Sequence, residues 1–374
     1  MVLFENSTLP VAIIGGGPVG LAAAAHLVKK GEEFILFEGG SSVGSSMLEW
    51  GHVRMFSPWQ YNIDKAAKEL LLQTGWELPN NDVIPTGREL VEEYLLPLSK
   101  LPALKDHITF NAKVVGIARK NIDKLKDAKR DRVPFQLYVE VGGDTKVYET
   151  KAVIDSSGTW KNPNPILSNG IWTNAERKLS DQIFYGIPNV LELESRYRNK
   201  SIMVIGSGHS AINALLDLAR LKGIFPATKI HWVLRKVSVS DAYSGQEKDG
   251  LQARGELGIR LQQLVETKTV NIMTPFYVNG VSAKDGKIFV TGNLNGEEAS
   301  IDGIDEIVVT TGFRPDTSFL QEVRLNLDSA VESVKALTPL IDPNIHSCGT
   351  VRPHGEEELR QPEKDFYIVG MKSY

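Results

Sequence analysis

The stretch from Val11 to Glu38 constrains the fold most strongly, because it reads as a strand, a glycine turn, a helix and a second strand. Its first four residues are apolar and mostly β-branched, which is typical of a buried strand. Glycines at the spacing G-x-G-x-x-G come next, and they are Gly15, Gly17 and Gly20. A helix is expected from about Pro18 to Lys30, before a strand over Phe34 to Phe37. The pattern predicts a βαβ unit of a parallel sheet.

Each glycine of this turn has its own reason to lack a side chain. Gly15 permits the tight turn, Gly17 lets the backbone approach a pyrophosphate, and Gly20 lets the helix lie close to the strand. The free N–H groups at the start of the helix then point at the diphosphate. The alternative is a glycine-rich turn that holds no ligand. Residues expected to contact the nucleotide here are Gly15, Gly17, Pro18, Val19 and Gly20.

Glu38 ends the second strand, 18 residues after the last glycine. An acid at this place accepts hydrogen bonds from the ribose hydroxyls of adenosine. Its charge repels a 2′-phosphate, so the pattern predicts FAD or NAD, rather than NADP, at this first site.

The composition of the chain argues against several classes of function. Its 374 residues suffice for two or three domains, and a net charge of −4 gives no reason to expect nucleic acid or an anionic membrane as partner. A single cysteine excludes a disulfide framework, a cysteine-rich metal site and a C-x-x-C pair. The histidines lack metal-site spacing, so no metal is expected. Without a long apolar run or a signal pattern, we expect a cytoplasmic protein.

The segment that follows the βαβ unit is a candidate pocket wall. Small residues from Gly39 to Ser46 let the backbone lie close to a ligand. Gly39 and Ser46 are themselves candidate ligand contacts. The aromatic run from Met47 to Asn62 either packs as core or lines a pocket for a flat ring. Arg54 and Trp59 are its candidate ligand contacts.

Apolar spacing and turn residues predict the next elements. Two helices are expected, over Ile63 to Thr74 and over Thr86 to Leu101. The dense charge from Arg119 to Arg132 predicts a solvated hairpin tip rather than a binding patch. Strands are expected over Ile108 to Ile117, Phe135 to Val141, Lys146 to Thr150 and Ala152 to Asp155, before a loop that contains Ser157 and Gly158.

A second strand, glycine turn and helix begins at Ser201. Gly206, Gly208 and Ala211 fit G-x-G-x-x-A, and the helix is expected to end at Gly223. Two dinucleotide sites are therefore predicted in one chain. Candidate contacts of the second are Gly206, Gly208, His209 and Ser210.

The strand after this second helix, Lys229 to Leu234, ends in Arg235 and Lys236, where the first site has an acid. Cations at this place suit a 2′-phosphate, so the second nucleotide is expected to be NADPH rather than NADH, with Arg235 as its contact. The alternative is a solvent-facing basic pair at a strand end.

The rest of the chain adds weaker candidates. Tyr243 to Leu257 is expected to be a mobile loop over the nicotinamide, with Arg254 as its contact. The loop at positions 346 to 355 either reaches the flavin or forms a dimer contact, and it contains His346, Cys348, Arg352 and His354. Short strands with turns at Asn279-Gly280, Asp285-Gly286 and Asn295-Gly296, then strands over Ile304 to Thr311 and Phe366 to Val369, complete the pattern.

Two nucleotide turns about 190 residues apart, with Ser-Gly-Thr at 157 to 159 and Thr-Gly at 311 and 312, resemble the two-dinucleotide-binding-domain flavoprotein superfamily. Its members include thioredoxin reductases and the flavin-containing and Baeyer–Villiger monooxygenases. The resemblance implies an α/β fold of two Rossmann-like, three-layer dinucleotide-binding domains, with the NADPH domain inserted into the FAD domain. The FAD domain would comprise residues 1–165 and 303–374, and the NAD(P)H domain residues 166–302.

The resemblance also implies site residues. Gly15, Gly17, Pro18 and Glu38 would hold the ADP part of FAD. The further residues implied are Val114 at the adenine, Gly158 and Gly312 at the crossings between the domains, and Gly370 and Met371 at the ribityl and isoalloxazine end.

This sequence departs from the family pattern at several motifs, and these departures argue against some of the activities found in the family. Thioredoxin reductase-like members use paired cysteines, and this chain has one. Gly370-Met371 stands where members commonly have Gly-Asp, and Val190 stands where the monooxygenase motif F-x-G-x-x-x-H has its histidine. Trp160 followed by Pro163 is closer to the monooxygenase style of crossing. Members continue into a helix that caps FAD where this sequence stops, which leaves truncation after Tyr374 open.

We therefore expect an FAD-dependent, NADPH-linked flavin monooxygenase that oxygenates a small organic substrate through a flavin C4a-peroxide. No side chain is assigned as a general acid or base, and Arg54, Trp59 and Arg254 are the pocket candidates. One alternative is a reductase that passes electrons from NADPH through FAD to a redox protein. Another is a redox sensor that binds both nucleotides without turnover.

Overall fold

The chain forms two compact units in a computed structural model that describes residues 8–243, 252–341 and 353–373. Unit 1 comprises Met1–Gly51, Pro58–Asn162 and Arg314–Tyr374. Unit 2 comprises His52–Ser57 and Pro163–Phe313, so it is inserted into unit 1 in the sequence. The chain passes between the units after Asn162 and after Phe313, and the short segment from His52 to Ser57 belongs to unit 2.

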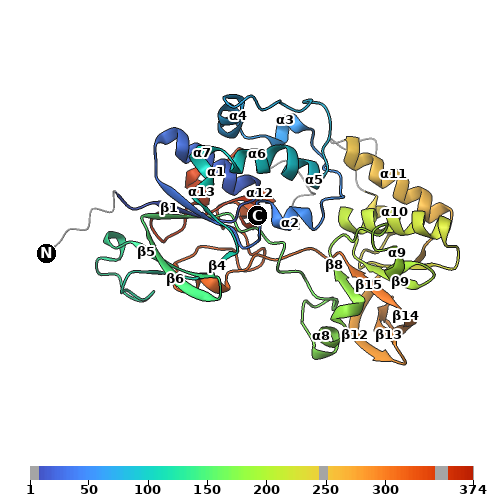
Figure 1. The fold of residues 1–374 in the computed structure, drawn as a ribbon. Helices are drawn as coiled ribbons and strands as arrows, with labels where there is room; N and C mark the ends of the chain where they lie inside the picture. Colours follow the sequence, from blue (N-terminus) through green and yellow to red (C-terminus); the bar gives the residue numbers. More distant parts are fainter. Residues whose placement is uncertain (1–7, 244–251, 342–352, 374) are drawn as a thin grey trace. The chain divides into compact units, whose positions relative to one another are not determined.

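Unit 1 is built on a parallel sheet of five strands in the order β16-β7-β1-β2-β3 (Figure 1). Their bounds are β1 Val11–Ile14, β2 Phe34–Phe37, β3 Ile108–Thr109, β7 Ala152–Asp155 and β16 Phe366–Ile368. Helix α1 (Pro18–Lys30) connects β1 to β2, as the sequence predicted residue for residue. Every side chain of β1 is buried, because both faces of the sheet are covered.

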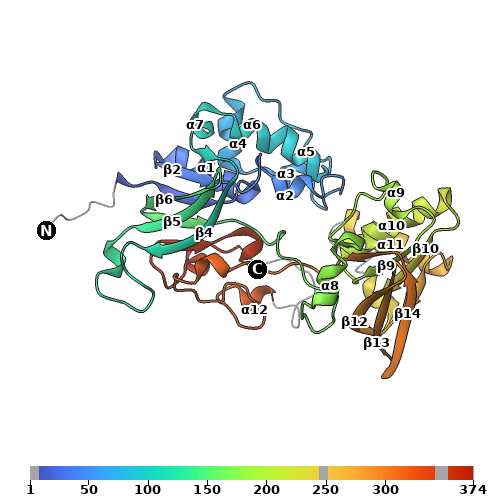
Figure 2. The same cartoon turned by 60° about the horizontal axis from the view of Figure 1, so that its bottom comes forward.

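An antiparallel sheet of β4 (Ala112–Arg119), β5 (Phe135–Val141) and β6 (Asp144–Thr150) forms another layer of unit 1 (Figure 2). Buried residues of the two sheets meet in one core, among them Ala12, Phe135 and Phe366. The expectation of a single strand over Ile108 to Ile117 is wrong. Asn111 has a φ of 50°, and this left-handed residue turns the chain from β3 in the first sheet into β4 in the second.

The helices of unit 1 depart from prediction at a proline. Helix α4 (Lys65–Leu72) is capped by Asp64 as expected, but the predicted helix over Thr86 to Leu101 is irregular. It consists of α5 (Gly87–Glu89), a π-helical segment (Leu90–Leu95) and α6 (Leu96–Ser99). Pro97 has no N–H to donate to the carbonyl of Glu93, and this carbonyl instead accepts a hydrogen bond of 2.8 Å from Trp76 Nε1.

The remaining short helices of unit 1 are α2 Ser45–Leu48, α3 Trp59–Asn62, α7 Pro102–Lys105, α12 Thr338–Ile341 and α13 Glu356–Leu359.

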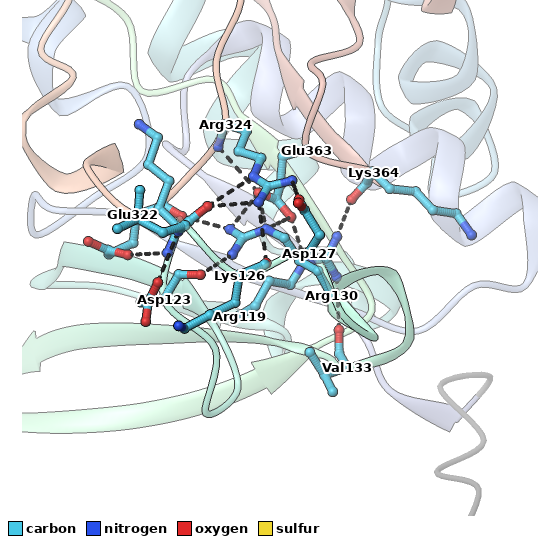
Figure 3. Close-up of polar contacts among 12 residues, drawn as sticks. Arg119, Asp123, Lys126, Asp127, Arg130, Val133, Glu322, Arg324, Glu363 and Lys364 are labelled. Carbon is cyan, nitrogen blue, oxygen red and sulfur yellow. Dashed lines mark hydrogen bonds and ion pairs between the residues drawn. The ribbon is translucent and has the colours of Figure 1, made fainter.

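The charged segment from Arg119 to Arg132 is not a purely solvated tip, which corrects the expectation from its composition. Arg119 and Arg130 are buried and share the buried carboxylate of Glu363 (Figure 3). Arg119 Nε lies 2.8 Å from Oε1 and Arg130 Nη2 lies 2.7 Å from Oε2. Burial raises the pKa of Glu363, but hydrogen bonds from the two guanidinium groups outweigh it, so the pKa is lowered overall.

Backbone carbonyls accept further hydrogen bonds from the two arginines of this cluster. Arg119 donates to the carbonyl of Val133, and Arg130 donates to those of Asp123 and Glu322. Residues from the hairpin loop and from the C-terminal part of unit 1 therefore meet in one buried polar network.

Unit 2 has a five-stranded parallel sheet in the order β11-β10-β9-β15-β8. The bounds are β8 Ile183–Tyr185, β9 Ser201–Ile205, β10 Lys229–Val233, β11 Asn271–Met273 and β15 Glu306–Val309. Alternate residues of β9 face opposite layers: Ile202 and Val204 pack with the helices, whereas Met203 and Ile205 pack with the antiparallel strands. The predicted three-layer α/β fold is confirmed.

The layers on this sheet are helical on one face and antiparallel on the other. The helices on one face are α9 Glu194–Tyr197, α10 His209–Ile224 and α11 Gln252–Glu266. The antiparallel strands on the other face are β12 Phe276–Lys284, β13 Lys287–Leu294 and β14 Glu297–Ile304, and the short helix α8 (Asn174–Lys178) contacts β12. The turns at Gly286 and Gly296 are confirmed, but Gly280 lies at a bulge inside β12 rather than in a turn.

Two further expectations for unit 2 are corrected. Helix α10 runs through Gly223 and ends at Ile224. The expected loop from Tyr243 to Leu257 is helical from Gln252 onward, and its residues 244–251 lie outside the described part.

Replacing Glu363 by Gln is expected to destabilise the protein by about 3–5 kcal/mol, because two buried guanidinium groups would lose their counter-charge. Denaturant unfolding measures the change. The matched control is Glu92→Gln, which removes an exposed i,i+4 pair with Arg88 and should leave the unfolding midpoint nearly unchanged.

The pH dependence of the free energy of unfolding tests the same ion pairs in a second way. Because the pKa of Glu363 is lowered by folding, its stabilisation is present above the unfolded value and is lost as pH falls through the folded value. The stability difference between wild type and E363Q should shrink below about pH 4. A difference that stayed constant from pH 7 to pH 3 would contradict the ion-pair account.

Candidate functional site

The first glycine turn leaves no room for side chains where the helix meets the strand. Gly15 has a φ of 99°, and a Cβ atom there would lie 2.7 Å from the carbonyl oxygen of Ser156. A Cβ atom at Gly20 would overlap the carbonyl oxygen of Gly15. Helix α1 can therefore approach the end of β1 only because these two positions are glycine.

Gly17 is different, because the protein itself does not require a glycine there. Its backbone is extended, with a φ of −84° and a ψ of −173°, which any residue can adopt. A Cβ atom would meet no protein atom within 4 Å. The space above Gly17, next to the first N–H groups of α1, is thus open for a diphosphate.

Glu38 is buried and held by three protein donors at the edge of the turn. Oε2 accepts a hydrogen bond of 2.7 Å from the backbone N–H of Gly16. Oε1 accepts hydrogen bonds of 2.7 Å from the backbone N–H of Gly40 and from Ser45 Oγ. A carboxylate has about four acceptor positions, so about one is left for a ribose hydroxyl. The donors and the opening over Gly17 fit the adenosine diphosphate part of FAD.

The ends of three parallel strands meet at this turn. Ser156, after β7, contacts Gly15, and a Cβ atom at Gly370, after β16, would lie 3.1 Å from Val19 Cγ2. The structure therefore brings the predicted residues Val19, Ser157 and Gly370 to one edge of the sheet. Among the other predicted FAD contacts, Val114 is buried in β4, Gly39 and Gly158 have open space at a Cβ position, Ser46 lies in α2, and Met371 is exposed.

An ion pair at this edge was missed by sequence reasoning. Lys372 is fully buried, with Nζ 2.6 Å from Asp155 Oδ2 and 3.3 Å from Ser157 Oγ. Asp155 Oδ1 accepts hydrogen bonds from the N–H and Oγ of Ser157. The only sequence signal was that Asp155 ends β7 and that Lys372 follows β16 by four residues, since β16 pairs with β7 and Ile368 lies beside Asp155.

The second glycine turn repeats the geometry in unit 2. Gly206 has a φ of 135°, and a Cβ atom there would overlap the side chain of Thr310 and lie 2.7 Å from its carbonyl oxygen. Thr310 Oγ1 donates a hydrogen bond of 2.8 Å to the carbonyl of Ile205. Gly208 has open space at its Cβ position, and Ala211 occupies the third position while fully buried.

A cavity of about 650 Å³ in unit 2 contains this turn. Its walls include Gly206, Gly208 and Ser210 from the turn, Arg235 and Lys236 from the end of β10, and Thr311 and Gly312 after β15. Arg235 Nη1 donates to the carbonyl of Ser168 at 3.2 Å, and Lys236 Nζ donates to the carbonyl of Asp241. Its size suits a small-molecule ligand, and its cations suit a phosphate.

The other predicted residues come from several elements of the two units. His209 begins α10, and its ring lies 5.0 Å from that of Phe56. Trp59 is buried in unit 1, whereas Arg54 lines another cavity of unit 2 and Arg254 lies on α11. His346, Cys348 and Arg352 lie outside the described residues, and His354 lies within them.

Comparison with known proteins agrees with this geometry. A ferredoxin–NADP reductase of Streptococcus agalactiae is 22% identical over 360 residues, or 95% of this chain and 89% of the relative. A bacillithiol disulfide reductase from Staphylococcus aureus superposes with a TM-score of 0.68 at 18% identity, over 98% and 90% of the two chains. An ornithine N-hydroxylase from Kutzneria sp. 744 gives 0.63 at 17% identity, over 98% and 94%. At these identities the two structures show the fold alone.

Two glycine turns, each at the head of its own parallel sheet, define a flavoprotein of the two-dinucleotide-binding-domain class, as the resemblance implied. The chain belongs to the pyridine nucleotide-disulphide oxidoreductase family, whose model matches residues 12–344. It is an oxidoreductase, and its cofactors are FAD and NADP(H). Within the described residues, no helix has both the length and the apolar character needed to cross a membrane.

The substitutions Gly17→Val and Gly208→Val test the two diphosphate-binding glycine turns one at a time. We call the turn in unit 1 the first cradle and the turn in unit 2 the second cradle. Both positions have an ordinary backbone and open space, so neither side chain should disturb folding. The valine at position 17 should block FAD, and the valine at position 208 should block NADPH while FAD is retained. Flavin absorbance after reconstitution and calorimetric titration with NADP⁺ measure the two effects.

Each variant is the control for the other, and thermal unfolding of the apo-proteins reports on folding. If G17V retained FAD as wild type does, the first cradle would not hold the diphosphate. If G208V bound NADP⁺ as wild type does, the second cradle would lose its assignment.

Proposed function

We propose that the chain is a flavin monooxygenase, which uses NADPH to oxygenate a small organic substrate. The family makes it an FAD-dependent oxidoreductase, so the proposal concerns the acceptor of the electrons. The single cysteine of the sequence carries it. Electron transfer to a disulfide proceeds through a pair of thiols, and one cysteine does not provide a pair. Molecular oxygen is then the simplest acceptor.

The proposal assigns FAD to unit 1 and NADPH to unit 2. Two features of opposite charge support this division. The buried carboxylate of Glu38 disfavours a 2′-phosphate at the first turn, whereas Arg235 and Lys236 line the cavity of the second. When bound, FAD supplies the exchange of two electrons between the nicotinamide and the acceptor.

The buried pair of Asp155 and Lys372 has a positioning role in this proposal. Lys372 Nζ bonds Asp155 Oδ2, and Asp155 in turn fixes both the N–H and the hydroxyl of Ser157. The pair therefore holds the turn at Gly370 against the loop after β7. A fixed edge of the sheet keeps the residues around the coenzyme in one arrangement.

A reductase for a redox protein is the second candidate, and it is supported by curated relatives that carry the name ferredoxin–NADP reductase. The two candidates differ in the molecule that accepts the electrons. Both would bind FAD in the first cradle and NADPH in the second. A homodimer and a cytoplasmic location stay predictions of the sequence.

Arg235→Gln is expected to weaken NADP⁺ binding about 10- to 100-fold, which corresponds to the loss of a charge-assisted phosphate contact. Binding of NAD⁺, which lacks the 2′-phosphate, should change little and serves as the internal control. Calorimetric titration of the FAD-loaded variant measures both. Equal weakening of NADP⁺ and NAD⁺ would show that Arg235 does not read the phosphate.

The acceptor is tested by following where the electrons of NADPH go. The FAD-loaded protein is mixed with NADPH, oxygen and panels of amines, sulfides and ketones, and oxygenated product, hydrogen peroxide and NADPH are quantified. A monooxygenase converts one substrate, one oxygen molecule, one NADPH and one proton into one oxygenated product, one NADP⁺ and one water. We expect one substrate class to raise product per NADPH toward unity while peroxide falls.

A different distribution of the electrons would contradict the monooxygenase proposal. Fast reduction of a ferredoxin by NADPH, with no small molecule that yields an oxygenated product, would exclude the monooxygenase and favour the reductase. The same assay with G208V, which should lose NADPH binding, controls for oxidation that does not involve the second cradle.

A further inference from the structure

Unit 2 contains another cavity, of about 370 Å³, that the nucleotide cradles do not use. It lies among α10, α11 and the segment from His52 to Ser57, and the two helices run side by side in both views (Figures 1 and 2). None of its lining residues also lines the nucleotide cavity.

The helix faces that form this cavity follow from residue spacing. Asn213, Asp217 and Arg220 are three or four residues apart on α10, so they share one face. Glu256 and Arg260 do the same on α11. Arg220 lies 11 residues after His209, about 16 Å along the helix at 1.5 Å per residue. Arg220 is therefore remote from the diphosphate end of α10, whereas Phe56 and Asn213 of the cavity wall lie beside His209 at that end.

Three guanidinium groups from three separate segments face this cavity: Arg54, Arg220 and Arg260. Two carboxyl groups, of Asp217 and Glu256, also line it. Arg220 Nη1 lies 3.3 Å from Asp217 Oδ1.

The convergence of these charges shows in the titration of Asp217. Burial raises the pKa of Asp217, and the positive charges of Arg220, His52 and Arg260 oppose this rise. Groups from α10, α11 and the segment at His52 therefore act on the same carboxyl.

The rest of the wall is apolar, with Val53, Met55, Phe56, Leu216 and Leu257. Such a cavity combines a surface for carbon groups with a cluster of planar cations that match a carboxylate in bidentate geometry.

We propose that this cavity binds a small organic acid, with its carboxylate among the three arginines and its carbon chain against the apolar wall. The inference is independent of the identity of the electron acceptor. It rests on unit 2 alone.

The test is calorimetric titration of the FAD-loaded full chain with hexanoate, its neutral counterpart hexanamide, and inorganic phosphate. We expect hexanoate to bind, and to bind more tightly than hexanamide or phosphate. Arg260→Gln and Arg220→Gln should each weaken hexanoate about tenfold, as the loss of one charge-assisted contact. The matched control Lys229→Gln removes an exposed cation outside the cavity and should leave the affinity within about twofold.

Saturating NADP⁺ separates this cavity from the second cradle. We expect hexanoate affinity to be unchanged, whereas displacement would mean that the acid occupies the cations at Arg235. Equal affinity in wild type, R260Q and R220Q, tighter binding of phosphate or hexanamide, or no hexanoate binding at all would each overturn the proposal. Unchanged thermal unfolding of both variants shows that any loss is not one of folding.

Discussion

The close approach of a helix to the end of a parallel strand is the constraint on which both cradles depend. At the first turn, Gly20 lies so near the carbonyl of Gly15 that any side chain would overlap it. At the second turn the buried Ala211 takes the equivalent helix position, and Gly206 has no room for a Cβ atom beside Thr310. Because the helix starts so close to the strand, its unpaired N–H groups face the open space above Gly17 or Gly208. A longer side chain at the contact would move the helix and its dipole away from that space.

Electrostatics then distinguishes two turns that are alike in backbone. Glu38 is a buried acid fixed by three donors, whereas Arg235 and Lys236 are cations in the wall of a cavity. A fixed carboxylate accepts ribose hydroxyls and disfavours an added phosphate, and cations do the reverse. The same glycine turn is thus used twice with opposite charge beside it, which supports the proposal that FAD binds in unit 1 and NADPH in unit 2.

Local features could be predicted from the sequence, and features set by distant residues could not. The bounds of α1 and the positions of both glycine turns follow from neighbouring residues, so they were predicted. The burial of Arg119 depends on Glu363, which is 244 positions away, and composition alone favours a solvated segment there. The pairing of Asp155 with Lys372, over 217 positions, was missed for the same reason.

We propose that each unit binds one nucleotide and that the bound nicotinamide reduces the bound flavin. Anaerobic titration of the FAD-reconstituted protein with NADPH tests it directly, by flavin absorbance against added equivalents. We predict one flavin per chain and complete bleaching near one equivalent of NADPH. A protein that stays colourless after reconstitution with excess FAD, or a flavin that excess NADPH does not bleach, would contradict it.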